Sequence, residues 1–120
     1  MYYAIHNSGG EDMADDTQMM KGILEGCVLA LLRTEPLYGY LVVERLRGYG
    51  FDAAEATIYP ILTRLEKKGD LQYKKRPSNL GPPRKYYELT DKGQNALSIF
   101  LHNWKTTRNL VDSLLKGEQA

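Results

Sequence analysis

The stretch from Ala54 to Leu89 places a short amphipathic helix pattern directly before two strand patterns that a basic loop joins. Its apolar residues recur at spacings of three, four and seven, which puts them on one face of a helix that stops at Gly69. These residues are Ile58, Ile61, Leu62 and Leu65. Two alternating patterns, 71–76 and 85–89, predict strands around a loop rich in Pro, Asn and Gly. A helix followed by a basic hairpin is suited to grip duplex DNA, with the helix in the major groove.

Three more helix patterns surround this segment. Apolar residues recur at helical spacing from about Met20 to Arg33, and a shorter helix is expected from Gly39 to Arg47. Thr90 is a good N-cap for a last helix that runs to about Lys116. Three helices followed by a hairpin predict a mainly α (α+β) fold, a winged helix-turn-helix with a long C-terminal dimerisation helix.

The chain divides into three predicted parts. Residues 1–19 form a polar arm with four acidic residues and no Lys or Arg, either flexible or docked on the body through its tyrosines. Residues 20–89 form the winged helix DNA-binding domain. Residues 90–120 form the C-terminal dimerisation helix.

The 120 residues suit a single domain with little room for a deep catalytic cleft. No run of about 18 apolar residues exists to span a bilayer, and the acidic N-terminus is unlike a secretion signal, so a cytoplasmic protein is expected. Cys27 is the single cysteine and is expected in the core. His6 and His102 lack the spacing of zinc ligands, and no phosphate loop or GxSxG motif occurs. We therefore expect no enzyme, no metal and no cofactor.

The net charge of +1 conceals a strongly basic segment. Between residues 64 and 85, eight Lys and Arg residues stand against two acidic residues, a local excess of six positive charges. Such an excess indicates a polyanionic partner, although runs of Lys and Arg are also commonly a solvated face. Here the cations stand at both ends of one hairpin loop, which projects them toward phosphates. Because alternate strand residues face opposite ways, we favour Lys75, Arg76 and Arg84 as phosphate contacts.

Several residues of the predicted third helix lie off its apolar face, and among them Lys67 is a further candidate for contact with DNA. Thr57, Thr63 and Arg64 are candidates for base edges or adjacent phosphates, because Thr can meet a thymine methyl group and Arg can bind guanine bidentately. Tyr59 is either a phosphate donor or a buried ring, and the two interpretations have equal weight. Pro60 lacks an N–H donor, so it fits best in the first turn of a helix that Thr57 caps.

The last helix pattern carries an apolar seam. Leu97, Trp104 and Val111 are seven residues apart, and so are Phe100, Thr107 and Leu114. The three helices and the hairpin already supply a core for so small a domain. The seam is therefore expected to pack against a second copy of the chain.

The chain resembles the PadR family of bacterial transcriptional regulators from about Met20 to its C-terminus. The resemblance rests on four motifs, LEGCVLALL (24–32), YGY (38–40), ATIYPILTRLEKKG (56–69) and GPPRKYYELTDKG (81–93). The single last helix with Trp104 is similar to that of the small subfamily. The first 18 or so residues have no counterpart there. Ala54 and Ala56 stand where members often have Ser and Gly, so Asp52 is a candidate for the helix cap instead.

The resemblance implies a homodimeric winged helix repressor whose third helix enters the major groove of double-stranded DNA. Residues of this chain that match the recognition helix by motif are Thr57, Tyr59, Pro60, Thr63 and Arg64, and those that match the wing are Gly81, Pro82, Arg84 and Lys85. In similar small members the tryptophan of the last helix lies near the dimer interface and can stack on flat aromatic effectors. The matching position and its neighbours are Trp104, Phe100, Leu101 and Val111.

The sequence therefore predicts a repressor that binds a pseudo-palindromic operator as a homodimer and is relieved by a small aromatic or drug-like effector. For Trp104 the alternative is that it is only dimer core. For the whole chain the alternative is a winged helix that contacts proteins and senses no ligand. The basic wing argues against that alternative, because protein interface cores are depleted in Lys.

Overall fold

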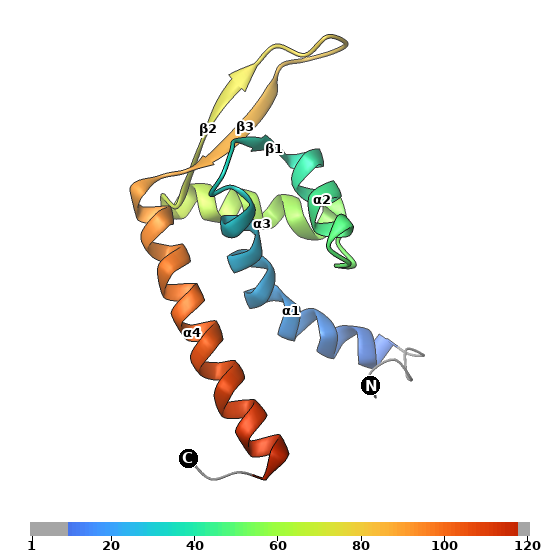
Figure 1. The fold of residues 1–120 in the computed structure, drawn as a ribbon. Coiled ribbons are helices and arrows are strands. Elements are labelled where there is room, and N and C mark those ends of the chain that lie inside the picture. The colour runs from blue at the N-terminus through green and yellow to red at the C-terminus, as the bar shows by residue number, and fades with distance from the viewer. Residues whose placement is uncertain (1–9, 118–120) are drawn as a thin grey trace.

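The computed structural model describes the backbone of residues 10–117 and the side chains of residues 19–117. Over that range, four helices and one antiparallel sheet form a single body from which a hairpin and a long helix project in different directions (Figure 1). The elements are α1 (Gly10–Leu31), β1 (Leu37–Tyr38), α2 (Gly39–Gly48), α3 (Glu55–Lys68), β2 (Leu71–Arg76), β3 (Arg84–Leu89) and α4 (Asp91–Lys116). The predicted winged helix order, with three helices, a hairpin and a long last helix, is confirmed.

The first helix begins at Gly10, so its predicted start near Met20 was wrong. Of the predicted arm, residues 1–9 lie outside the described residues.

A short strand that the sequence did not reveal completes the sheet. Leu37 and Tyr38 form β1, which pairs with Tyr87 and Tyr86 of β3 and gives the strand order β1-β3-β2. Two residues are too few to produce an alternating pattern. This strand matters for the site because it places Tyr38 beside the hairpin.

The core lies where α1, α2, α3 and the inner face of the sheet meet. The whole predicted apolar face of α3 is buried there, as expected from its spacing. Cys27 packs against this core from α1 and is half-buried, and burial raises the pKa of its thiol. No helix within residues 10–117 has the length and apolar character to cross a membrane.

The start of α3 differs from the prediction. Ala54 is the N-cap and offers no side-chain hydrogen bond, so neither Thr57 nor Asp52 caps the helix. The backbone N–H groups of Thr57 and Ile58 donate to the Ala54 carbonyl instead, both at 3.0 Å. Pro60 therefore lies inside the helix rather than in its first turn. The proline removes a bond to the carbonyl of Ala56, an exposed residue where water can replace the missing donor.

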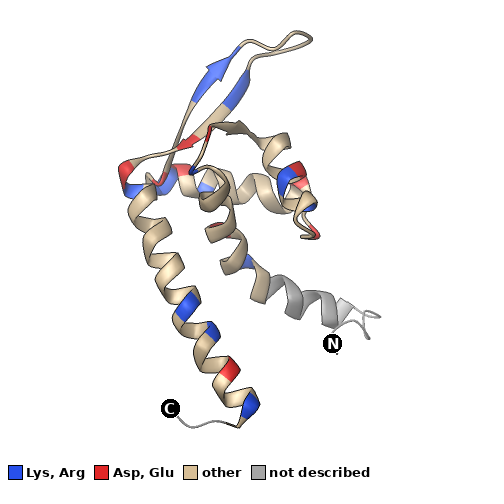
Figure 2. Ribbon diagram, viewed as in Figure 1, with Lys and Arg blue, Asp and Glu red and all other residues tan. Residues whose placement is uncertain are grey.

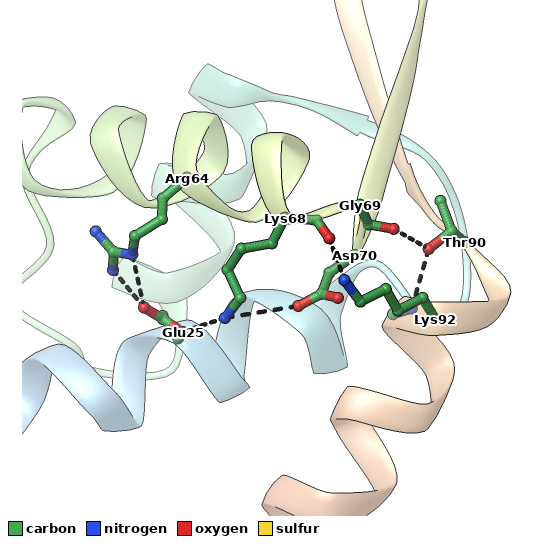
Figure 3. Close-up of polar contacts among 8 residues, drawn as sticks. Glu25, Arg64, Lys68, Gly69, Asp70, Thr90 and Lys92 are labelled. Carbon is green, nitrogen blue, oxygen red and sulfur yellow. Dashed lines mark hydrogen bonds and ion pairs between the residues drawn. The ribbon is translucent and has the colours of Figure 1, made fainter.

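The start of α4 is fastened to the turn that follows α3 (Figure 3). Thr90 is the predicted N-cap, and its Oγ1 accepts a hydrogen bond from Gly93 N at 3.0 Å and donates one to the Gly69 carbonyl at 2.6 Å. The Thr90 N–H donates to the Asp70 carbonyl at 3.1 Å. A Cβ atom at Gly93 would lie only 2.0 Å from that carbonyl oxygen, so glycine is required for this close approach.

Candidate nucleic-acid interface

The outer face of α3 carries the predicted recognition residues. All six are solvent-exposed, opposite the buried apolar face of the helix. They are Thr57, Tyr59, Pro60, Thr63, Arg64 and Lys67. The prediction that Thr57, Thr63, Arg64 and Lys67 lie off the apolar face is thus confirmed. The contact of all six residues with DNA stays a prediction.

The hairpin of β2 and β3 is the wing, and its register decides which cations share a face. Arg76 pairs with Arg84, and Lys75 pairs with Lys85 on the next rung. Successive strand residues face opposite sides, so the two arginines lie on one face and the two lysines on the other. Lys and Arg occupy both strands of the projecting hairpin (Figure 2). Among the described residues, no carboxylate forms an ion pair with any of these four cations.

Three of the wing cations lie over tyrosine rings. The pairs are Arg76 over Tyr86 at 4.4 Å, Arg84 over Tyr38 at 4.3 Å, and Lys85 over Tyr73 at 4.5 Å from the ring centroid. An aromatic face attracts a cation without neutralising it, unlike a carboxylate. The rings therefore hold the cations in place and leave their charge available to an anion.

The tip of the wing is shaped by its own backbone. Gly81 has a φ of 121°, which other residues rarely adopt, and Ser78 Oγ lies 2.9 Å from the carbonyl oxygen of Pro82, to which it donates. The predicted wing residues Gly81 and Pro82 thus belong to the loop that joins the two strands on which the cations lie.

A groove runs between the N-terminal half of α3 and the wing. Its lining residues are Tyr38, Gly39, Tyr40, Tyr59, Leu62, Thr63, Arg84, Lys85 and Tyr87. A Cβ atom at Gly39 would lie 2.8 Å from Tyr59 Cε1, so the glycine admits the tyrosine ring. Two predicted recognition residues and two predicted wing residues thus border one groove. The YGY motif, residues 38–40, lines a third side of this groove. The sequence pattern did not indicate this role.

Tyr59 is 40% exposed, so it is not the fully buried ring that was one of its two predicted alternatives, and a phosphate contact stays a prediction. Its ring packs against Gly39. Partial burial, and next the carboxylate of Glu55, raise the pKa of Tyr59 above its ordinary value. A tyrosine hydroxyl is protonated at neutral pH even without such a shift, and a protonated hydroxyl can donate a hydrogen bond to a phosphate oxygen.

Arg64 differs from the other recognition candidates because a carboxylate already holds it. Its Nε lies 3.0 Å from Glu25 Oε2 of α1, and Nη2 contacts the same oxygen. Lys67 forms no ion pair among the described residues. The wing lysine Lys74, by contrast, lies 3.6 Å from Glu88. Within the basic segment 64–85, the cations that form no ion pair among the described residues are thus Lys67 on α3 and the four at the outer part of the wing.

The four C-terminal candidates all lie on α4 and differ in exposure. Leu101, Trp104 and Val111 are each between 43% and 45% exposed on α4. Phe100 is half-buried instead, because its ring lies over Gly26 of α1, where a Cβ atom would come within 2.4 Å of it. A shallow hollow on α4 contains two of the candidates, and its lining residues are Leu101, His102, Trp104, Lys105 and Arg108. No three His, Cys, Asp or Glu side chains of the described residues are placed to hold a metal ion.

An exposed helix beside a basic wing, on a helix-turn-helix core, defines a winged helix DNA-binding protein. Residues 28–99 match the model of the PadR-like transcriptional regulator family. The chain belongs to this family. It is therefore a transcriptional regulator with a DNA-binding fold, and the family is not one of enzymes.

Solved structures support the assignment over nearly their whole length. A PadR-like transcriptional regulator from Bacillus cereus is 42% identical, with a TM-score of 0.75, and the match covers 84% of this chain and 99% of that one. A PadR family regulator from Eggerthella lenta is 34% identical, with a TM-score of 0.77, and the match covers 88% and 94%. An uncharacterised protein of Lysinibacillus sphaericus is 28% identical over 104 residues, which are 84% of this chain and 95% of that protein.

Proposed function

We propose that the protein is a cytoplasmic repressor that binds a pseudo-palindromic operator as a homodimer. In each subunit α3 enters the major groove and the wing follows the adjacent phosphate backbone. The observation that carries the proposal is the groove between α3 and the wing, which Tyr59 and Thr63 border on one side and Arg84 and Lys85 on the other. Two-fold symmetry puts the half-sites about one helical turn, roughly 34 Å, apart.

Selection of bound fragments from a genomic library tests this proposal and identifies the operator. If each subunit neutralises about four phosphates, log affinity should fall against log salt with a slope of about −7 for the dimer. Transcription of the gene beside the selected site should rise when the protein is removed. A folded dimer that binds no DNA at low salt would exclude the proposal.

A double variant, Arg76→Ala with Arg84→Ala, tests the wing. We expect weaker binding to all sequences alike and a salt slope that is shallower by about 0.9 for each lost phosphate contact, about 3.6 for a dimer. The matched control is Lys105→Ala with Lys116→Ala, which removes two cations from α4. A change in sequence preference in the wing variant would show instead that these arginines contact bases.

We also propose that a planar aromatic effector binds near Trp104 and relieves repression. The supporting observation is the hollow on α4, in which Trp104 stands beside Leu101 with its side chain partly exposed. Phe100 is better explained as a contact between α4 and α1, and Val111 extends the same exposed face. Because the chain has one tryptophan, quenching of its fluorescence by a panel of planar aromatic compounds reports binding directly. Absence of saturable quenching would leave Trp104 as dimer core.

A further inference from the structure

Carboxylates from neighbouring elements hold two cations of α3. The carboxylate of Glu25 contacts Arg64 through both Nε and Nη2, and its second oxygen lies 3.8 Å from Lys68 Nζ. Lys68 Nζ also lies 3.8 Å from Asp70 Oδ2. Figure 3 shows Glu25 between Arg64 and Lys68, with Asp70 on the other side of the lysine. One glutamate of α1 thus engages two cations of the recognition helix.

The two cations lie on the flank of α3 that faces α1, whereas Tyr59 and Thr63 line the groove toward the wing. The Glu25 side chain is only 27% exposed, so solvent and salt screen it less than an open surface charge. The Nε–H and Nη2–H donors that Arg64 gives to Glu25 are not available to a phosphate or a guanine, and they hold the guanidinium on the α1 side of the helix. The Glu25 contact therefore competes with any DNA contact that needs this edge of Arg64 or a move of its side chain away from α1.

We propose that Glu25 is a specificity-determining residue of the DNA interface, because it holds Arg64 on α1 and keeps a sequence-independent phosphate contact out of the complex. This inference rests on the proposed DNA binding. An arginine that meets phosphates strengthens binding to every sequence alike. Retaining Arg64 on Glu25 lowers binding to non-operator DNA without altering the base contacts, which widens the ratio between operator and non-operator affinity.

The variant Glu25→Gln tests the inference, because it keeps the shape of the side chain and removes its charge. Binding to a random-sequence duplex is measured against salt concentration for the full chain. Release of one arginine per subunit should steepen the salt slope by about 0.9 per subunit, about 1.8 for a dimer, and tighten non-operator binding on the order of tenfold at low salt. The ratio of operator to non-operator affinity should fall.

The matched control is Glu35→Gln, which removes the same charge from another arginine–glutamate pair, that of Arg45 and Glu35 at 3.2 Å. It should leave the slope unchanged, and an equal steepening in both variants would attribute the effect to net charge and overturn the inference. Circular dichroism and thermal unfolding of each variant establish that it is folded.

Arg64→Gln, alone and combined with Glu25→Gln, identifies the cation responsible. Alone, Arg64→Gln should leave the salt slope as it is in the unaltered protein. In the double variant, it should abolish the steepening of the slope that Glu25→Gln causes. A shallower slope for Arg64→Gln alone would show that Arg64 already contacts DNA and would overturn the inference while leaving the proposed function intact. A steeper slope that persists in the double variant would also overturn the inference and leave the proposed function intact. Failure of the unaltered protein to bind any DNA would remove the proposed function and the inference together.

Discussion

Gly22 and Gly26 lie one turn apart on α1, but their surroundings differ. A Cβ atom at Gly22 would meet no atom within 4 Å, whereas one at Gly26 would meet three ring atoms of Phe100 at 2.4 Å. From the sequence both glycines only weaken the helix, because a helical periodicity gives no information on what a distant helix brings to each position. The structure shows that a side chain at Gly22 would have free space, whereas Gly26 makes room for the contact between α1 and α4.

Alanine substitution should therefore have opposite effects at these two positions. Gly22→Ala should raise the free energy of unfolding by up to about 1 kcal/mol, because alanine favours the helix. Gly26→Ala should lower it by about 1 kcal/mol, because displacing the Phe100 ring outweighs the same gain in helix propensity. Urea unfolding at one fixed protein concentration measures both. Equal stabilisation by the two substitutions would contradict the packing of Phe100 on α1.

At the scale of the elements, the helices and the hairpin could be predicted because each carries a local period. Four apolar residues specify the buried face of α3, and the alternation from Leu71 to Leu89 specifies the hairpin. The contacts that complete the site are not local. The short strand at Leu37 and Tyr38 exists only because β3 pairs with it, and the hold of Glu25 on Arg64 joins residues 39 positions apart.

The N-cap of α3 at Ala54 was missed for a related reason. A capping rule looks for a polar side chain, but here the backbone carbonyl of Ala54 accepts the first bonds and no side chain takes part. The cap of α4 at Thr90 could be predicted, whereas its second bond, to the carbonyl of Gly69, depends on the fold.

Thr90 should contribute to stability through both of these bonds. Thr90→Ala should lower the free energy of unfolding by about 1–2 kcal/mol, because the cap and the bond to Gly69 are both lost. Thr90→Ser keeps the hydroxyl and should retain most of that stability. Thermal and urea unfolding of the two variants provide the measurement. A serine variant as unstable as the alanine variant would attribute the effect to the lost methyl group instead.

At the scale of the whole molecule, α4 exposes more apolar surface than a solitary helix would be expected to keep in water. Leu114 and Leu115 are 76% and 78% exposed, and Leu110 is 63% exposed. The far half of α4 extends beyond the body of the molecule (Figure 1). A surface of this kind is typical of an interface with another protein, and a second copy of the chain is the occupant that we propose.

Leu114→Glu should therefore weaken self-association. Burying one leucine from each of two subunits contributes about 3 kcal/mol or more, so the dissociation constant should rise at least a hundredfold. Analytical ultracentrifugation across a range of concentrations measures the change. Leu80→Glu is the matched control, because Leu80 is 92% exposed at the tip of the wing, away from α4. If both variants associate like the unaltered protein, the stripe on α4 does not form the dimer.

The hydrogen bonds between the start of α4 and the turn after α3 determine how a movement of α4 would reach α3. The 26 residues of α4 make a rod about 39 Å long, and its first turn is bonded to Gly69 and Asp70. A displacement of about 3 Å at the free end of such a rod corresponds to a tilt of only about 4° at the fastened end. Movement at the far end of α4 would therefore reach α3 as a small rotation rather than as a translation. The angle at which α3 meets the groove of DNA, and not its depth, is the quantity that this architecture would adjust.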